Sequence, residues 1–134
     1  LDALEHEDVD HRHQHTAAAE DFAGFAKAVI DGRHVHVSGT LGHDPATGAL
    51  PEDVGDQLRN ALQTVATTLS QAGLGLADVK QVRVYITEGA FVKPVALGLK
   101  AAFDSVRPTN TLLICQIPAP GAKVEIEVSA SRPA

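Results

Sequence analysis

The chain has a single cysteine, Cys115, which excludes an intramolecular disulfide framework and fits a reducing compartment. No apolar run approaches the ~20 residues that a membrane-spanning helix needs. The N-terminal segment lacks the basic start and apolar stretch of a secretory signal, so we expect a cytoplasmic protein without a membrane partner. A length of 134 residues suits one domain with a substantial core.

An excess of positive charge is also missing. Residues 1–21 carry seven acidic side chains and one basic one, whereas residues 22–134 carry ten of each. Nucleic-acid binding depends on a field of lysine and arginine side chains. We therefore expect no nucleic-acid partner.

The short motifs of many enzymes are absent. The sequence has no glycine-rich phosphate loop and no serine nucleophile elbow, and HVHVSG has the wrong context for a helical metal motif. Cys115 lies in an apolar run, without a basic neighbour in sequence that would activate its thiol. We interpret it as a small hydrophobic residue rather than a nucleophile.

Residues 1–21 are rich in charge and poor in large apolar side chains. Such a segment cannot offset its ordering entropy by burial, so we expect a flexible acidic, histidine-rich arm before one folded domain over residues 22–134. His11, His13 and His15 alternate, which on an extended strand would give either a divalent-metal cluster or a polar tail. Without a fixed backbone to set their geometry, we predict no metal site.

The stretch FAGFAKAVIDGRHVHVSG predicts a β-hairpin, because two short runs meet at Asp31 and Gly32, a pair suited to a type I′ turn. Its second strand alternates valine with histidine, so one face is apolar. His34 and His36 on the other face are either catalytic bases or part of a solvated or interface face. Neither has an acidic neighbour in sequence, which favours the second interpretation.

Two helices and three strands follow. The turn-rich stretch TLGHDPATGALPED predicts a loop. Apolar residues at helical spacing predict one helix from Asp53 to Ala72 and another from Phe91 to Phe103, which Gly98 weakens. Strands are predicted in VKQVRVYIT and AKVEIEVSA, which alternate, and in NTLLICQI, which is apolar enough to be covered on both faces.

The element order ββαβαββ indicates a mixed sheet with both helices on one face, an α+β two-layer sandwich. The other face would include the NTLLICQI strand, which is too apolar to face water. We therefore expect subunits to bury these faces against each other in an oligomer.

Two long stretches carry a resemblance to a known family. VHVSGTLGHDPATGALPEDVGDQLRNALQTVATTLSQAGLGLADVKQVRVYIT and RPTNTLLICQIPAPGAKVEIEVSA resemble the central and terminal pattern of the Rid family (YjgF/YER057c/UK114), over about residues 22 to 132. The resemblance implies a chorismate-mutase-like fold and a homotrimer whose sheets face a central barrel. Well-studied members are cofactor-free imine/enamine deaminases that release ammonia and a 2-keto acid at a site between subunits.

The resemblance also implies site residues. Phe25 takes the place of an aromatic residue, often Tyr, that packs on the ligand, and Gly39 matches a glycine that lines the pocket. From the residues alone, Glu125 and Glu127 fit an ordinary solvent-exposed strand face. The resemblance instead implies that Glu125 holds or activates the attacking water.

The stretch PTNT departs from the family's P-x-R-S pattern, because Asn110 takes the place of a substrate-binding arginine, followed by Thr111 and Leu112. A neutral amide binds a carboxylate more weakly than the paired donors of a guanidinium. Arg107 is either a compensating cation or a surface residue. Three steps along a strand would place it on the opposite face from Asn110, unless the bend at Pro108 or a neighbouring subunit brings it in.

The leading hypothesis is therefore a cofactor-free homotrimeric deaminase acting on a small imine or enamine. Glu125 would position the water, and Asn110 with the backbone N–H groups near Thr111 and Leu112 would orient the substrate. One alternative is a non-catalytic trimer that binds small molecules. Another is a relative recruited to a different reaction in a specialised pathway.

Overall fold

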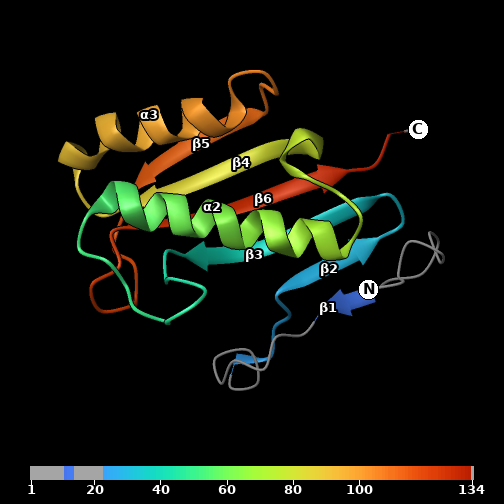
Figure 1. Cartoon of the computed structure of the whole chain (residues 1–134), viewed down its shortest axis with the longest axis horizontal. Helices are drawn as coiled ribbons and strands as arrows, with labels where there is room; N and C mark the ends of the chain where they lie inside the picture. The colour runs from blue at the N-terminus through green and yellow to red at the C-terminus, as the bar shows by residue number, and fades with distance from the viewer. Residues whose placement is uncertain (1–10, 14–22, 134) are drawn as a thin grey trace.

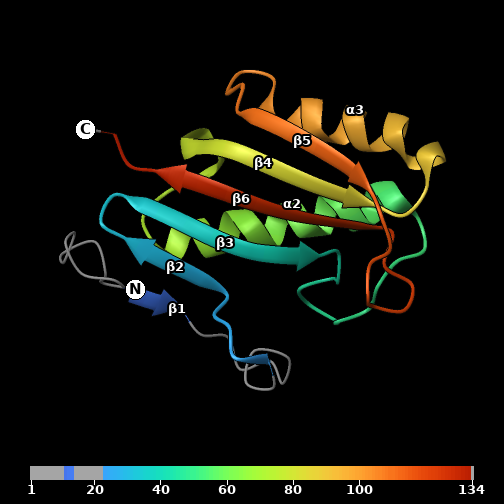
Figure 2. The ribbon, with the colours of Figure 1, turned by 180° about the vertical axis from the view of Figure 1, so that it is seen from behind.

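The computed structural model describes residues 11–13 and 23–133, which form one mixed β-sheet with two α-helices on one face (Figures 1 and 2). The strands lie in the order β1-β2-β3-β6-β4-β5; β4 and β5 are parallel, and the other neighbours are antiparallel. Their bounds are β1 His11–His13, β2 Ala28–Asp31, β3 His34–Leu41, β4 Val79–Ile86, β5 Thr109–Ile114 and β6 Val124–Ser131. The helices are α2 Val54–Gln71 and α3 Val92–Phe103, with short 3-10 turns η2 Leu76–Asp78 and η3 Gly89–Phe91.

The predicted order ββαβαββ and the two-layer arrangement are confirmed. The extra strand β1 comes from the segment expected to be an arm, and its backbone pairs with β2 at the sheet edge. Residues 1–10 and 14–21 of that segment lie outside the described residues. No helix in the described part of the chain is long and apolar enough to cross a membrane.

The hairpin is confirmed, but its predicted turn is wrong by one residue. Asp31 still pairs with His34, so the turn consists of Gly32 and Arg33. Gly32 has a positive φ of 60° and Arg33 does not. This pattern belongs to a type II′ turn rather than a type I′ turn, which requires positive φ at both positions.

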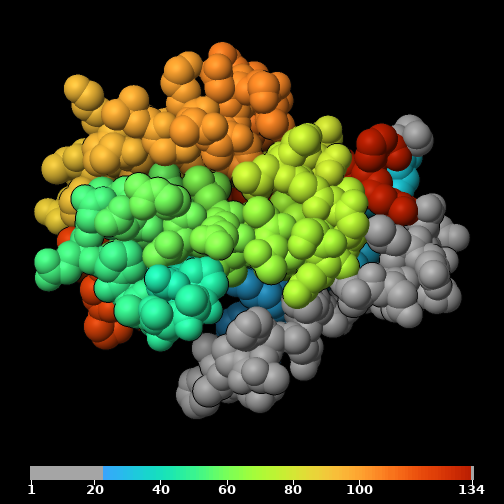
Figure 3. Space-filling model, in the orientation of Figure 1, coloured from blue at the N-terminus to red at the C-terminus, as the bar shows by residue number. Residues whose placement is uncertain are grey.

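Helix α2 packs on β3 and β6, and α3 packs beside α2 with Val95 and Phe103 in the same core, so that both helices lie over this face (Figure 3). Asp53 caps α2 by accepting a hydrogen bond from the Asp56 N–H at 3.0 Å, which explains why the helix begins there. A Cβ on Gly98 would lie 2.6 Å from Leu58 Cδ2. The glycine that weakens α3 by propensity is therefore needed where α3 approaches α2.

Strict alternation in β6 divides the sheet into two sides. Val124, Ile126 and Val128 are buried beneath the helices. The side away from the helices, which faces the viewer in Figure 2, is here called the open face. The register of the strands places mostly polar side chains and the exposed Leu113 on it. Its central residues are His36, Arg83, Tyr85, Thr111, Leu113, Glu125, Glu127 and Ser129.

Within the single chain β5 is largely uncovered, so the predicted cover on both faces would have to come from other copies in the expected oligomer. Only Leu112 of this strand is half-buried, where it packs against the core, and the other five residues are exposed. Leu113 and Ile114 expose 48% and 58% of their surface. Because β5 is the last strand of the sheet, it presents an apolar edge in the single chain.

Candidate functional site

A groove of about 690 Å³ surrounds the carboxyl group of Glu125, and we call it the Glu125 groove. It lies where β3 ends and β6 begins. Phe25, with 42% of its surface exposed, and Gly39 also line it. The remaining lining residues include Lys27, Ser38, His43, Asp44, Pro45, Thr67, Ile117, Pro118 and Ala119.

A β-bulge places Gly39 against Glu125. The register between β3 and β6 shifts between Val37 and Thr40, so Ser38 and Gly39 interrupt the regular pairing. A Cβ on Gly39 would lie 2.9 Å from Glu125 Cδ and 3.0 Å from Oε2. Only a residue without a side chain leaves the carboxyl group in this position.

The surroundings of Glu125 favour its protonated form. The carboxyl group is half-buried, and loss of hydration raises its pKa above the ordinary 4.5. The negative charge of Glu127 raises this pKa further, and Lys27 opposes the shift. Glu127 in turn accepts a hydrogen bond from the Tyr85 hydroxyl, and this bond raises the pKa of Tyr85.

The two loops that contribute residues to the groove are tied together by Gln57, a fully buried residue of α2. Its Nε2 donates to the carbonyl oxygens of Pro51 at 2.6 Å and Gly121 at 3.0 Å, and its Oε1 accepts from the Lys123 N–H at 2.9 Å. One helix thus anchors the loop after β3 and the loop before β6. Gln57 is not among the site residues predicted from the sequence, where its one signal is a polar residue bordering an apolar stripe.

The candidate residues around β5 lie apart from Glu125. Asn110 pairs with the buried Val82 and faces the helices, so its side chain lies on the opposite side of the sheet from Glu125. Thr111 shares the open face with Glu125, and Leu112 packs on the core. Within one protomer the structure therefore brings together Phe25, Gly39 and Glu125, but not Asn110.

Arg107 lies on the same side of the sheet as Asn110, as the alternative of a bend before β5 allowed, and not on the opposite face, where an extended strand would place it. Arg107 precedes β5 and has a φ of 56°, so the chain is not extended between the two residues. Both line a second pocket on the helix side of the sheet. The Arg107 guanidinium bonds to Asp104 there.

The remaining candidates lie outside the groove. His34 and His36 are exposed, as predicted, and His36 Nδ1 lies 3.2 Å from Ser129 Oγ. Cys115 is exposed rather than buried. The described residues contain no group of three or more His, Cys, Asp or Glu side chains that could hold a metal, and His15 lies outside them.

Proteins of similar sequence and fold identify the family of this chain. The model of the family described as Endoribonuclease L-PSP matches residues 15–132. The crystal structure of Rv2704 from Mycobacterium tuberculosis, described as a member of the YjgF/YER057c/UK114 family, superposes with a TM-score of 0.83 and 31% identity, covering 92% of this chain and 100% of that one. The chain belongs to the YjgF/YER057c/UK114 (Rid) family.

Two other Rid proteins resemble this chain in sequence or in structure over most of its length. The 2-iminobutanoate/2-iminopropanoate deaminase of Bos taurus is 30% identical over 107 residues, which are 79% of this chain and 78% of the relative. The structure of Escherichia coli TdcF with bound serine superposes with a TM-score of 0.77 and 28% identity, covering 91% and 94% of the two chains. The fold is therefore the chorismate-mutase-like fold of this family, as predicted.

Proposed function

We propose that this Rid protein is a cofactor-free deaminase that hydrolyses the C=N bond of a small 2-imino acid and releases ammonia. The observation that carries the proposal is the half-buried Glu125 carboxyl group, packed against Gly39 with its pKa raised. A carboxylate with a raised pKa is a stronger general base than an exposed one. The relatives named 2-iminobutanoate/2-iminopropanoate deaminase suggest the class of substrate.

The proposed reaction needs only the imine and one water molecule. The Glu125 carboxylate accepts a proton from water as the water oxygen bonds to the imine carbon, and the C=N electron pair moves to nitrogen. Glu125 then returns the proton to nitrogen. Glu125 next carries the proton of the new hydroxyl group to nitrogen. The C–N bond breaks as the carbonyl group of the 2-keto acid forms, and ammonia leaves. An enamine enters the same path after a proton adds to its β-carbon.

Two observations support a site shared between copies in a homotrimer. Leu113 and Ile114 expose apolar surface on β5, and one side of this edge strand pairs with no other strand of the described chain. In the proposed assembly, β5 of one copy lies beside the Glu125 groove of the next. The peptide N–H groups near Thr111 and Leu112 then meet the substrate carboxylate, and the Phe25 ring packs on the carbon chain.

This arrangement revises the role expected for Asn110. Because its side chain faces the helices, Thr111 is the neighbouring residue whose side chain shares a face with Glu125. We propose that Thr111 Oγ1, rather than the Asn110 amide, donates to the substrate carboxylate.

The test is ammonia release from freshly generated 2-iminopropanoate and 2-iminobutanoate. Wild type should accelerate release over buffer, and Glu125→Gln should lose about 100-fold or more of that rate, as expected for a lost general base. Glu88→Gln, which removes an exposed carboxylate, is the matched control and should keep full activity. Equal rates for wild type and Glu125→Gln would falsify the mechanism.

The alternative is a trimer that binds small molecules without catalysis, or one recruited to another reaction. The proposed carboxylate contacts on β5, the Thr111 hydroxyl and the peptide N–H groups, are neutral. This favours the alternative, since neutral donors hold a carboxylate more weakly than an arginine does. A wild-type protein that binds 2-oxobutanoate in the Glu125 groove but releases ammonia no faster than buffer would support this alternative.

A further inference from the structure

A second pocket, of about 280 Å³, opens between the end of α3 and the start of β5, and we call it the α3–β5 pocket. Val82 and Phe103, both buried, and the half-buried Leu99 form an apolar floor. The rim is polar. It consists of Lys100, Asp104, Arg107, Pro108 and Asn110.

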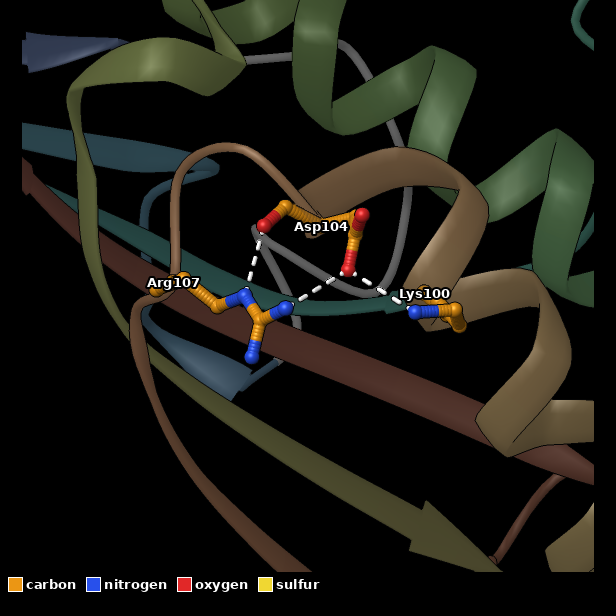
Figure 4. Close-up of polar contacts among 3 residues, drawn as sticks. All are labelled: Lys100, Asp104 and Arg107. Atoms are coloured by element: carbon orange, nitrogen blue, oxygen red, sulfur yellow. Dashed lines mark hydrogen bonds and ion pairs between the residues drawn. The ribbon is translucent and has the colours of Figure 1, made fainter.

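Asp104 holds two cations together at the mouth of this pocket. Lys100 Nζ and Arg107 Nη2 each lie 2.9 Å from Asp104 Oδ1, and Arg107 Nε donates to the Asp104 carbonyl oxygen at 2.6 Å (Figure 4). Each cation uses only part of its donors in these contacts. With two cations and one carboxylate, the rim carries one excess positive charge.

The backbone at Arg107 supports a specific role for this side chain. Its φ of 56° is the one positive value at a non-glycine residue in the described part of the chain. The conformation costs about 1–2 kcal/mol for an L-residue with a Cβ, and glycine would avoid that cost. The chain nevertheless has an arginine at this position. Since glycine would be less strained, we attribute the arginine to the use of its guanidinium at the pocket rim.

We propose that the α3–β5 pocket is a second ligand site, for a small organic monoanion with an apolar end. The anionic group would lie between Lys100 and Arg107, with the Asn110 amide as a further donor. The apolar end would lie on Val82 and Phe103. The pocket is on the helix side of the sheet and Glu125 is on the open face, so this site does not depend on the proposed deaminase activity.

Titration calorimetry on the full chain tests the site, with benzoate as the probe. Benzamide has the same shape without the charge, and acetate has the charge without the apolar end. Because the rim charges are exposed and screened, we expect benzoate to bind with a Kd of about 1 mM and the two other compounds about tenfold more weakly. Absence of benzoate binding would overturn the proposal.

Substitutions of the two rim cations, compared with control substitutions on the open face, test where benzoate binds. Arg107→Asn removes the guanidinium but tolerates a positive φ. Lys100→Gln removes the ammonium group at an exposed helix position, together with its ion pair to Asp104. Each should weaken benzoate binding about tenfold, by loss of one charge-assisted contact. Arg83→Gln removes an exposed cation from the open face and should leave the affinity unchanged, as should Glu125→Gln. Unchanged affinity in both rim variants, or a loss of affinity in Glu125→Gln, would place benzoate elsewhere and overturn the proposal.

Discussion

Gly39 and Glu125 lie on neighbouring strands so close together that a single methyl group on Gly39 would overlap the Glu125 carboxyl group. Such a Cβ would lie 2.9 Å from Glu125 Cδ, closer than nonbonded carbon atoms approach. The bulge in β3 creates this contact. The position of the proposed base is therefore set by a backbone feature of the opposite strand.

Gly39→Ala should displace the Glu125 carboxyl group and reduce kcat about tenfold or more, since small displacements of a catalytic group lower rates strongly. Thermal unfolding should change little, because Glu125 can rotate into the groove. Gly75→Ala is the matched control, since a Cβ there meets no atom within 4 Å. Full activity in Gly39→Ala would show that the observed carboxyl position is not the active one.

The pH dependence of kcat/KM reports the ionisation of Glu125. The base acts as a carboxylate, so activity should rise with pH and level off above the pKa, with a midpoint above 4.5. Glu127→Gln removes a negative charge that raises this pKa, so the midpoint should move to lower pH. Glu88→Gln should leave it in place. A midpoint that does not move in Glu127→Gln would contradict the assignment of the acidic limb to Glu125.

Gln57 should contribute strongly to stability. Gln57→Leu keeps the side-chain volume similar but leaves the Pro51 and Gly121 carbonyl oxygens and the Lys123 N–H without their partner. A buried polar group without a partner costs about 1–3 kcal/mol, so urea unfolding should show a loss of at least about 2 kcal/mol. Gln63→Leu changes an exposed residue of the same helix and should lose less than about 0.5 kcal/mol. Equal losses in both variants would count against the anchoring role.

The proposed assembly gives a prediction for Leu113. Light scattering should show wild type as a trimer at micromolar concentration. Leu113→Asp places a charge on the open face and should dissociate the trimer and abolish deaminase activity together. Leu97→Asp changes an even more exposed leucine, on the helix side, and should remain trimeric. A monomeric wild-type protein would contradict the shared site.

Local patterns in the sequence were sufficient to predict which side chains of β6 face the core and which face away from it, because alternation assigns each residue to one side. They did not decide the place of Arg107, where a positive φ ends the extended chain and brings the residue to the same pocket as Asn110. The role of Gln57 depends on partners up to 66 residues away, which no local pattern encodes. The bulge that places Gly39 against Glu125 depends on the pairing of β3 with β6, so its geometry required the folded chain.

Ammonia release from 2-iminopropanoate by wild type and Glu125→Gln tests the central claim most directly. We predict clear acceleration over buffer by wild type, and a loss of about 100-fold or more in a Glu125→Gln protein that unfolds at the same or a higher temperature. The same rate for the two proteins, or a wild-type rate equal to that of buffer, would contradict the claim that Glu125 acts as the base of a deaminase.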